Sequence, residues 1–501
     1  MMDLIITLIS KICYFLWGDW IHIPLPGSGT LDLPLLVLIL VPAGVYFTIR
    51  TGFLQIRMFP DMLRAVLEHA GVSKYAEAAE DAEADDKGAA VPAGNTPDTA
   101  ETGKKKKRNG ISALQALVVS TATRVGMGNL VGVVAAVSAG GAGAVFWMWV
   151  TALIGSATAF IEATLAQLHK EKDPLYGGYR GGPAYYIHDW INSKRKGAPK
   201  KSILAILFAL SGLICWCGIS QVVSNSVTSS FENAFNIPPI YTVSVLVILA
   251  AIIVLRKNAT VKVLDVLVPI MAGIYILLTL YMIFTNIGQL GTAFKNIFTE
   301  AFGLRQAAAG TFGAVLMNGV KRGLFSNEAG SGSAPCAAAA AEASHPAKVG
   351  LMQAFGVFID TLLCTCTALI MLVVPESVIA GQEGMGLLQA AMAWHMGEAG
   401  VIFIAAVLWL FSFTTFLGIL FYARSNVAYL FGDNWASQTA YKVVALVMLF
   451  IGGLATYTFV WDLGDVGIGL MTIFNMIALI PLSKQALDSL KDFEAKKRLR
   501  K

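Results

Sequence analysis

Two clusters of glycine and polar residues interrupt long apolar stretches of this 501-residue chain. The first runs from Ser120 to Gly132 (S-T-A-T-R-V-G-M-G-N-L-V-G) and the second from Gly323 to Pro335 (G-L-F-S-N-E-A-G-S-G-S-A-P). A bilayer offers no water to loose backbone groups, so irregular backbone at membrane depth survives only when it is buried in protein or lines a polar cavity. The pair therefore indicates two broken membrane helices that form the binding site of a transporter.

The first cluster combines glycines with polar side chains. Gly126, Gly128 and Gly132 permit positive φ and the close approach of a ligand. A resumed half-helix should begin near Asn129, where free N–H groups and a partial positive charge suit a carboxylate. Carbonyls at the end of the preceding half-helix, near Thr121–Thr123, suit a cation or an ammonium group. Close helix packing is the structural alternative; it suffices for Gly132 alone but explains the Asn and Thr cluster poorly.

The second cluster contains a carboxylate. Ser326, Asn327 and Glu328 precede Gly330. A carboxylate within a membrane span is costly and is usually functional. Glu328 therefore either faces a cation or a substrate amine, or forms a structural ion pair that locks the two broken helices together. The candidate partners for such a pair are Lys321, Arg322 and Arg124. Asp360, in F-I-D-T-L, is a second intramembrane carboxylate, suited to a coupling ion or to a structural pair.

Polar residues also occur in two other apolar stretches. Gln221 and Asn225 lie four residues apart, so they share one face of a predicted helix. They either reach a central ligand or bond to a neighbouring helix. Ser412, Thr414 and Thr415 supply hydroxyls opposite the first cluster, and hard cations such as Na⁺ prefer oxygen ligands. The alternative for these three hydroxyls is bonding back to their own helix.

The composition identifies the environment of these clusters. The chain is 56% hydrophobic and 14% charged, whereas soluble proteins are about 45–50% apolar and about 25% charged. Apolar runs of about 20 residues recur along the chain, which predicts an all-α polytopic membrane protein. We predict eleven transmembrane helices, near residues 33–49, 112–140, 143–168, 202–229, 239–255, 264–285, 310–340, 347–374, 399–422, 440–460 and 464–482.

The order of these spans predicts an inverted repeat. The two broken spans are the second and the seventh, so one extra N-terminal helix precedes five helices and then five more. Because five is odd, the second set enters the membrane from the opposite side, as in one major class of secondary transporter. The sequence has no G-x-x-x-x-G-K-[ST] motif, which argues against ATP-driven transport. It also lacks a nucleophile–base set, which argues against an enzyme.

The predicted domains follow from these spans and from the distribution of charge. Low hydrophobicity and high charge predict disorder for the segment 76–108. The divisions are 1–32, an N-terminal amphipathic segment at the membrane surface; 33–75, the extra helix and the start of a cytoplasmic loop; 76–108, the disordered cytoplasmic insert; 109–286 and 287–482, the two five-helix repeats; and 483–501, a basic cytoplasmic tail.

The loop charges predict the orientation. Lys and Arg gather in 104–108, 170–196, 256–257 and 496–501. Of the two opposite loops, 376–398 contains neither and 286–309 contains only Lys295 and Arg305, which does not overturn the bias. Basic loops face the cytoplasm, so we expect the N-terminus outside and the C-terminus inside, in the cytoplasmic (inner) membrane of a prokaryote. The net charge of +5 then reflects these loops and not an affinity for nucleic acid.

Five stretches of the chain resemble the alanine/glycine:cation symporter family, also called the sodium:alanine symporters. They are T-R-V-G-M-G-N-L-V-G-V, G-A-V-F-W-M-W-V-T-A-L-I-G, G-G-P-A-Y-Y-I, G-L-F-S-N-E-A-G-S-G-S-A-P and G-V-F-I-D-T-L-L-C-T. Together they are highly specific. The resemblance implies a leucine-transporter-type fold with eleven helices. It also implies Na⁺- or H⁺-coupled uptake of alanine, glycine or a related small amino acid, although some members of the family are assigned to glutamine.

The resemblance also assigns residues to roles. It places the two broken helices at Thr123–Gly132 and Ser326–Pro335 and the hydroxyls of the Na⁺ site at Ser412–Thr415. Gln221 matches a glutamine in a helix that faces the site. The candidate substrate-binding residues are Thr123, Gly126, Gly128, Asn129, Gln221, Asn225, Ser326, Asn327, Glu328 and Gly330, and the candidate Na⁺ ligands are Thr121, Gly126, Ser412, Thr414 and Thr415.

These residues lead to the hypothesis of one site shared by a small amino acid and Na⁺. Na⁺ would bind between Ser412–Thr415 and backbone carbonyls near Thr121–Gly126, with the substrate carboxylate at freed amides near Gly126–Asn129. The substrate ammonium would face carbonyls, Glu328 or Gln221. The alternatives are a glutamine or serine symporter of the same family, H⁺ as the coupling ion, a channel, and a non-transporting amino-acid sensor on the same fold. The lipid bilayer is the expected surrounding, and the oligomeric state stays open.

Overall fold

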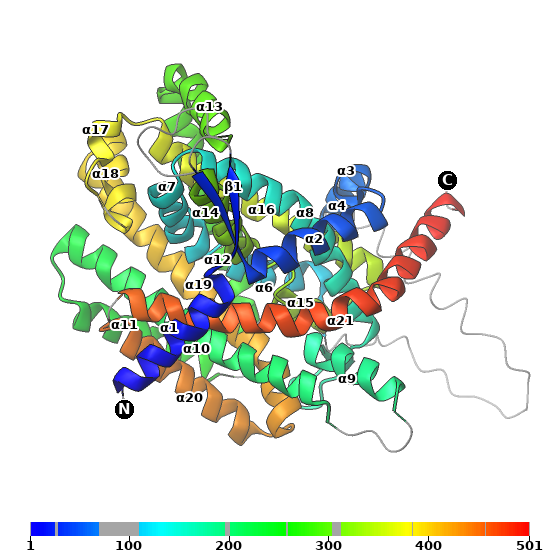
Figure 1. Ribbon diagram of the computed structural model, residues 1–501. Helices are drawn as coiled ribbons and strands as arrows, with labels where there is room; N and C mark the ends of the chain where they lie inside the picture. The colour runs from blue at the N-terminus through cyan, green and yellow to red at the C-terminus, as the bar shows by residue number, and fades with distance from the viewer. Residues whose placement is uncertain are drawn as a thin grey trace, which may run out of the picture.

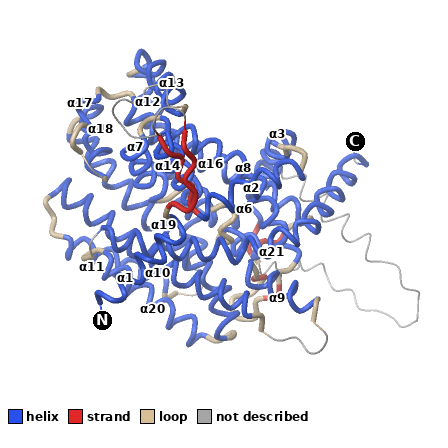
Figure 2. The backbone as a smooth tube through the Cα atoms, viewed as in Figure 1, coloured by secondary structure: helices blue, strands red, loops and turns tan. Residues whose placement is uncertain are grey.

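Helices dominate the computed structural model (Figure 2), which describes residues 2–25, 29–69, 110–195, 201–256, 259–302, 312–382, 384–455 and 457–499. The predicted insert 76–108 lies outside these residues. Within the described part the strands form three two-stranded sheets. They are antiparallel β1 (Asp19–Leu25) with β2 (Gly29–Pro34), parallel β3 (Ile111–Ser112) with β6 (Ala341–Glu342), and antiparallel β4 (Glu171–Lys172) with β5 (Tyr179–Arg180).

The described parts of the chain contain the following helices. Those up to α12 are α1 (Met2–Trp17), α2 (Leu35–Arg50), α3 (Leu54–Arg57), α4 (Phe59–His69), α6 (Ala113–Arg124), the π-helical turn η1 (Gly128–Gly132), α7 (Val133–Gly140), α8 (Gly143–Leu168), α9 (Pro183–Ser193), α10 (Ile203–Phe235), α11 (Pro239–Val254) and α12 (Ala259–Thr285). The remainder are α13 (Ile287–Ala301), α14 (Phe312–Asn327), α15 (Ala334–Ala340), α16 (Pro346–Leu372), α17 (Glu376–Ile379), α18 (Met385–Met396), α19 (Glu398–Phe431), α20 (Trp435–Gly452) and α21 (Tyr457–Leu499).

Polar side chains cap the starts of α6, α10 and α20. Ser112 and Gln115 form a reciprocal capping box at the start of α6, because each side chain accepts a hydrogen bond from the other's backbone N–H. Ser202 caps α10 by accepting from Ala205 N, and Asn434 Oδ1 caps α20 by accepting from Ser437 N at 2.7 Å. These caps satisfy backbone donors at helix starts that would otherwise lack a partner.

The structure confirms a polytopic all-α membrane protein. Among the described residues, seven helices are long and apolar enough to cross a bilayer, and the bent pair formed by α6 and η1–α7 gives an eighth. α2 and α11 are apolar helices of 16 residues each. The second broken span consists of α14 and α15, which are separated by six residues. The count of eleven spans therefore stays a prediction.

Several predicted loops and end segments contain regular structure. α13 lies in the predicted loop 286–309, and α17 and α18 lie in 376–398. The N-terminal segment 1–32 forms α1 and most of the β1–β2 hairpin, and Trp17 Nε1 donates to Asp465 O of α21 at 3.0 Å. α21 is a helix of 43 residues that runs through the predicted span 464–482 and on into the predicted tail as far as Leu499 (Figure 1).

Glycines bring α10 close to α20 and α21, which lie beside it in Figure 1. A Cβ built on Gly452 of α20 would lie 2.2 Å from the Cα of Gln221, and one built on Gly467 of α21 would lie 2.3 Å from the Cα of Cys215. Small residues allow such close approach between membrane helices, where dispersion contacts replace the hydrophobic effect as the main attraction. The three helices therefore form one tightly packed wall.

The end of α8 anchors the C-terminal end of α15. Gln167 Nε2 donates to the carbonyls of Ala338 and Ala341, and Lys170 Nζ lies 2.7 Å from the oxygen of Ala341. A cation at a helix C-terminus complements the helix dipole. The half-helix that follows the second cluster is therefore held at its far end.

Burial lowers the pKa of Lys170 from 10.5 to about 8, against a smaller raising effect of Glu342. Below about pH 8 Lys170 is charged in both the folded and the unfolded protein, so burial of its charge lowers the stability of the fold by the full desolvation cost. Between about pH 8 and 10.5 the folded protein has lost this proton and the unfolded chain has kept it, so the stability rises with pH. We expect the unfolding temperature of Lys170→Met to rise less than that of the wild type between about pH 8 and 10.5. Thermal unfolding at several pH values checks this, with the exposed neighbour Lys172→Met as control; equal slopes for wild type and Lys170→Met would contradict it.

Candidate functional site

The first cluster breaks a membrane helix, as predicted. α6 ends at Arg124, and Val125 N donates to Thr121 O at 2.6 Å to close the last turn. The chain then bends by 45° before η1 and α7 continue it. Helical geometry resumes at Gly128, one residue before the predicted start at Asn129. The break lies among buried residues, which is where a membrane protein tolerates irregular backbone.

The second cluster is also irregular. Glu328, Gly330 and Gly332 have φ angles of 56°, 91° and 83°. A residue with a Cβ costs about 1–2 kcal/mol in this left-handed region, so Glu328 is held there by its surroundings. Asn327 Oδ1 supports the turn by accepting from Ala329 N at 2.9 Å. The turn aims the Glu328 side chain at the first break.

Glu328 joins the two breaks through hydroxyl groups. Its Oε2 accepts from Ser333 Oγ at 2.7 Å and from Thr123 Oγ1 at 3.3 Å. The hydroxyl of Tyr422, in α19, lies 3.5 Å from the same oxygen and 2.7 Å from Thr123 Oγ1. The residue is 7% exposed. A buried carboxylate therefore lies at the meeting point of α6, α19 and the second break, with hydroxyls as its neighbours.

The three bases considered as partners of Glu328 bond elsewhere. Lys321 Nζ lies 2.9 Å from Asp465 Oδ2, and Arg322 Nη1 lies 4.0 Å from Asp465 Oδ1. Arg124 is fully buried, and its Nη1 donates to Gln353 O at 3.0 Å. The ion pair proposed as a lock between the broken helices is therefore not formed by these bases.

Asp360 of α16 joins the same two breaks. Its Oδ1 accepts from Asn129 Nδ2 and from Ser326 Oγ, each at 2.8 Å. Asn129 Oδ1 in turn accepts from Gly126 N at 2.9 Å. Asn129 thus uses both ends of its amide to hold the first break against α16. The contacts of Asp360 correspond to the structural interpretation of this carboxylate.

A third buried carboxylate, Glu162 of α8, was missed by the sequence analysis. Its Oε1 accepts from Gly330 N at 3.2 Å, and its Oε2 accepts from Asn475 Nδ2 at 3.1 Å. Asn475 also donates to Gly330 O at 3.0 Å and accepts from the hydroxyl of Tyr186. Glu162 therefore fixes the backbone of the second break. The signal was present, since an acidic residue inside an apolar run is the pattern that singled out Glu328 and Asp360.

A cavity lies between the two breaks, α10, α19 and α21. It is lined by Thr123, Met127, Gly128, Ile219, Phe325, Ser326, Glu328, Thr415, Ile419 and Ile468. The polar lining comes from one carboxylate and three hydroxyls, and the other side chains are apolar. Binding pockets commonly combine apolar walls with a few convergent polar groups in this way. The arrangement can hold a small solute that carries a positive charge beside an apolar side chain.

The hydroxyls of α19 point in different directions. Thr415 lies against the first break, since a Cβ built on Gly126 would be 1.9 Å from Thr415 Oγ1, and Thr415 Oγ1 donates to Ala122 O at 3.3 Å. Ser412 Oγ is buried and has no hydrogen-bond partner among the described residues. Thr414 Oγ1 and Thr415 Oγ1 both bond to carbonyls of their own helix, but Thr414 Oγ1 faces Met271 Sδ of α12 at 3.4 Å and not the first break. Ser412 and Thr415 fit an oxygen-ligated cation better than Thr414 does.

Gln221 and Asn225 face away from this group. Gln221 Nε2 donates to Met448 Sδ of α20 at 3.3 Å, and Asn225 Nδ2 donates to Gly452 O and Ala455 O at 3.2 and 2.8 Å. These contacts match the alternative of bonding between helices. Of the predicted substrate-binding residues, the structure therefore gathers Thr123, Gly126, Gly128, Asn129, Ser326, Asn327, Glu328 and Gly330 at the two breaks and leaves these two amides on the far side of α10.

Alanine substitutions at two glycines of the first break should have opposite outcomes for stability. We expect Gly126→Ala to destabilise the protein by about 1–3 kcal/mol, because its Cβ would overlap the stiff side chain of Thr415 and push α6 from α19. Gly132→Ala is the matched control, since a Cβ there meets nothing within 4 Å. The close-packing interpretation of Gly132 is therefore wrong. Thermal unfolding of both purified variants checks the pair; equal unfolding temperatures would contradict the prediction.

Comparison with known proteins assigns the chain to a family. The sequence model described as the sodium:alanine symporter family matches residues 26–82 and 94–501. The chain belongs to the sodium:alanine symporter family. The resemblance found in the sequence motifs is thus confirmed. The family is one of transporters, and this chain is a multi-pass membrane protein.

Relatives of this symporter-family chain cover nearly its whole length. The probable sodium/glutamine symporter GlnT of Bacillus subtilis (strain 168) is 39% identical over 480 residues, which are 95% of this chain and 91% of that protein. The sodium/alanine symporter AgcS of Methanococcus maripaludis is 32% identical over 494 residues, 97% of each chain. The crystal structure of MhsT in complex with L-phenylalanine is similar in fold, with a TM-score of 0.53 at 13% identity over 74% of this chain and 88% of that one. The family member therefore has the leucine-transporter-type fold.

Proposed function

We propose that this protein imports a small neutral amino acid, alanine or glycine, together with Na⁺. The observation that carries the proposal is the cavity between the two helix breaks, with Glu328 on its polar side and Thr415 beside the first break. The names of the relatives support coupling to sodium. The proposal includes eleven transmembrane helices, with the N-terminus outside and the C-terminus inside the cytoplasmic membrane of a prokaryote.

The substrate is held by opposite charges at the two breaks. Its ammonium group faces Glu328, and its carboxylate lies at the helix start at Met127–Gly128, which favours negative charge. The amides on either side already have partners, because Gly126 N donates to Asn129 Oδ1 and Asn129 N donates to Gly126 O. Na⁺ lies beside it, with oxygen ligands from Ser412, Thr415 and backbone carbonyls of the first break. Inward movement of one Na⁺ releases about 2.3 kcal/mol per 100 mV of membrane potential. One ion can therefore drive accumulation of tenfold or more.

The walls of the cavity favour a short aliphatic side chain. Met127, Ile219 and Ile468 face it. Of its four polar side chains, Glu328 and Thr415 are assigned to the substrate ammonium and to Na⁺, and the hydroxyls of Thr123 and Ser326 already donate to Glu328 and Asp360. A glutamine amide placed against these apolar residues would lose its hydrogen bonds with water, at about 1–3 kcal/mol for each group left unpaired. Alanine and glycine carry no such group. The alternative, glutamine, rests on the name of one relative.

Uptake of radiolabelled alanine into proteoliposomes tests this function, with and without an inward Na⁺ gradient. We expect Na⁺-dependent accumulation that Asn129→Ala abolishes, because its amide joins Gly126 to Asp360. Asn318→Ala is the control, since the amide of Asn318 donates to Ala314 of its own helix.

Other outcomes redirect the assignment. Accumulation driven equally by a proton gradient without Na⁺ would keep the fold and replace the coupling ion. Accumulation of glutamine but not alanine would overturn the substrate. Binding of alanine without accumulation under either gradient would point to the sensor alternative.

A further inference from the structure

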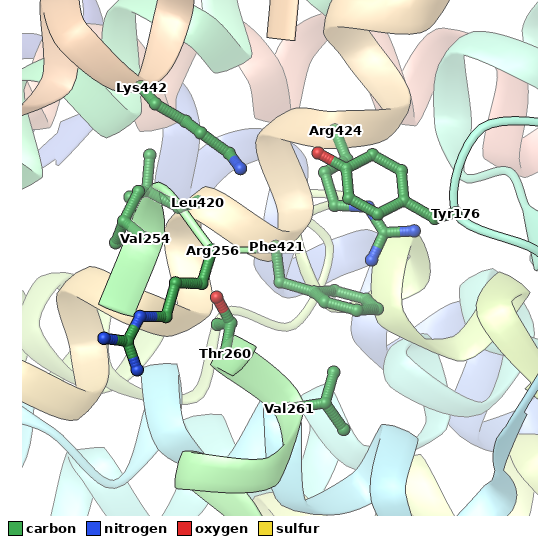
Figure 3. A pocket seen from close by; sticks show the side chains of 9 residues that line it. All are labelled: Tyr176, Val254, Arg256, Thr260, Val261, Leu420, Phe421, Arg424 and Lys442. Carbon is green, nitrogen blue, oxygen red and sulfur yellow. The ribbon is translucent and has the colours of Figure 1, made fainter. Parts of the chain in front are cut away.

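A second cavity lies on the other side of α19 (Figure 3). It is lined by the ends of α11 and α12, by α19 and α20, and by the loop that follows α8. The lining residues are Tyr176, Val254, Arg256, Thr260, Val261, Leu420, Phe421, Arg424 and Lys442. Ile419 lines the first cavity and Leu420 lines the second. The two cavities therefore lie on different faces of the same helix.

The lining of this second cavity is positively charged. Arg256, Arg424 and Lys442 come from three different elements, and none of the nine lining residues is acidic. Asp173 neutralises Arg424, with Nη2 and Oδ2 3.0 Å apart. Arg256 and Lys442 have no carboxylate within ion-pair distance among the residues that the structure describes. The cavity therefore keeps an excess of two positive charges.

Two buried donors also lack partners there. The hydroxyl of Tyr176 and the Nε of Arg424 are buried without a hydrogen-bond partner in the described part of the chain. The Arg424 guanidinium stacks over the Tyr176 ring, 3.7 Å from its centroid, which holds both groups at the cavity (Figure 3). Leaving a buried polar group unsatisfied costs about 1–3 kcal/mol. A ligand with several negatively charged oxygens would satisfy both donors and the two uncompensated charges.

We propose that this cavity binds the phosphate group of an anionic phospholipid. Phosphate presents several acceptor oxygens to arginine, lysine and hydroxyl donors. The position of the cavity favours a lipid, because the adjacent end of α11 exposes apolar residues. Ile252 and Leu255 are 49% and 52% exposed. Basic pockets between membrane helices on the cytoplasmic side suit anionic headgroups, and the loop charges predict that this end faces the cytoplasm.

Binding of lipids to the purified full-length chain tests the proposal. Native mass spectrometry and thermal unfolding in neutral detergent compare phosphatidylglycerol, phosphatidylcholine and inorganic phosphate. We expect phosphatidylglycerol to bind and to raise the unfolding temperature, and phosphatidylcholine to do neither. One cation near the surface is worth about 1 kcal/mol of attraction to anionic lipid, so the double variant Arg256→Gln, Lys442→Gln should weaken that binding by about tenfold or more.

Lys262→Gln is the matched control, because Lys262 is an exposed cation two residues after Thr260 on α12 and does not line the cavity. It should bind phosphatidylglycerol as the wild type does, and both proteins should retain Na⁺-dependent uptake. Stabilisation by inorganic phosphate alone would keep a phosphate site but overturn the lipid assignment. Equal binding of the two lipids, or unchanged binding by the double variant, would overturn the proposal altogether.

Discussion

Replacing Glu328 by glutamine is expected to lower the apparent affinity for alanine by about 10- to 150-fold. The substitution keeps the shape of the side chain but removes its charge. Hydrogen bonds to charged groups contribute about 1.5–3 kcal/mol, and about 1.4 kcal/mol corresponds to a factor of ten. The glutamine oxygen can still accept from Thr123 and Ser333, but the variant loses the negative charge that strengthens these bonds and attracts the substrate ammonium. The concentration of alanine that gives half-maximal Na⁺-driven uptake in proteoliposomes measures the effect.

Glu232→Gln provides the comparison for this variant. Glu232 is an exposed carboxylate near the end of α10, so its neutralisation changes the total charge equally without touching the cavity. Its uptake should match that of the wild type. If Glu328→Gln transports alanine with unchanged affinity, then Glu328 does not contact the substrate and serves only to hold the two breaks together.

Replacing Ser412 by alanine is expected to raise the Na⁺ concentration for half-maximal uptake by about tenfold or more. Ser412 Oγ is buried and lacks a hydrogen-bond partner among the described residues, so its lone pairs are available to ligate a cation. Loss of one oxygen ligand should weaken the binding of Na⁺ by about as much as the loss of a hydrogen bond to a charged group, about 1.5–3 kcal/mol. Uptake of alanine at a series of Na⁺ concentrations gives the value.

Thr414→Ala is the control on the same helix. Its hydroxyl bonds to Leu410 O and Phe411 O and faces α12, so its loss should shift the Na⁺ dependence by less than about twofold. Shifts of equal size in Ser412→Ala and Thr414→Ala would mean that α19 does not ligate Na⁺ through the face that carries Ser412 and Thr415.

The breaks and their polar residues could be predicted from the sequence because the membrane imposes a strong rule. Irregular backbone and carboxylates are so unfavourable in hydrocarbon that glycine clusters and acidic residues inside apolar runs stand out. Glu328 and Asp360 were found in this way, and both join the two breaks. The same rule applied to every span would also have found Glu162.

The rotation of each helix about its axis could not be predicted. α10 is largely apolar all round, so periodicity does not show which side faces α20 and which faces the cavity. Gln221 and Asn225 were therefore assigned to the site, whereas Gly452 and Ala455 of the neighbouring segment accept the bonds of Asn225. The β1–β2 hairpin was missed for a different reason, since short strands outside the apolar runs leave a weak pattern.

α21 extends from the cavity to a point far from it. At 1.5 Å per residue, its 43 residues span about 65 Å, roughly twice the thickness of the hydrocarbon core. Ile468 touches the cavity, and the far end is tied to α4 through Lys497 and Asp61 and to α3 through Glu494 and Arg57. Leu499 lies 31 residues, or about 46 Å, along the helix from Ile468, and Pro481 between them removes one hydrogen bond of the helix backbone. A tilt of about 5° at the cavity that passes through Pro481 undiminished would move the far end by about 4 Å. Spectroscopic labels on that end would therefore report the occupancy of the cavity without touching it.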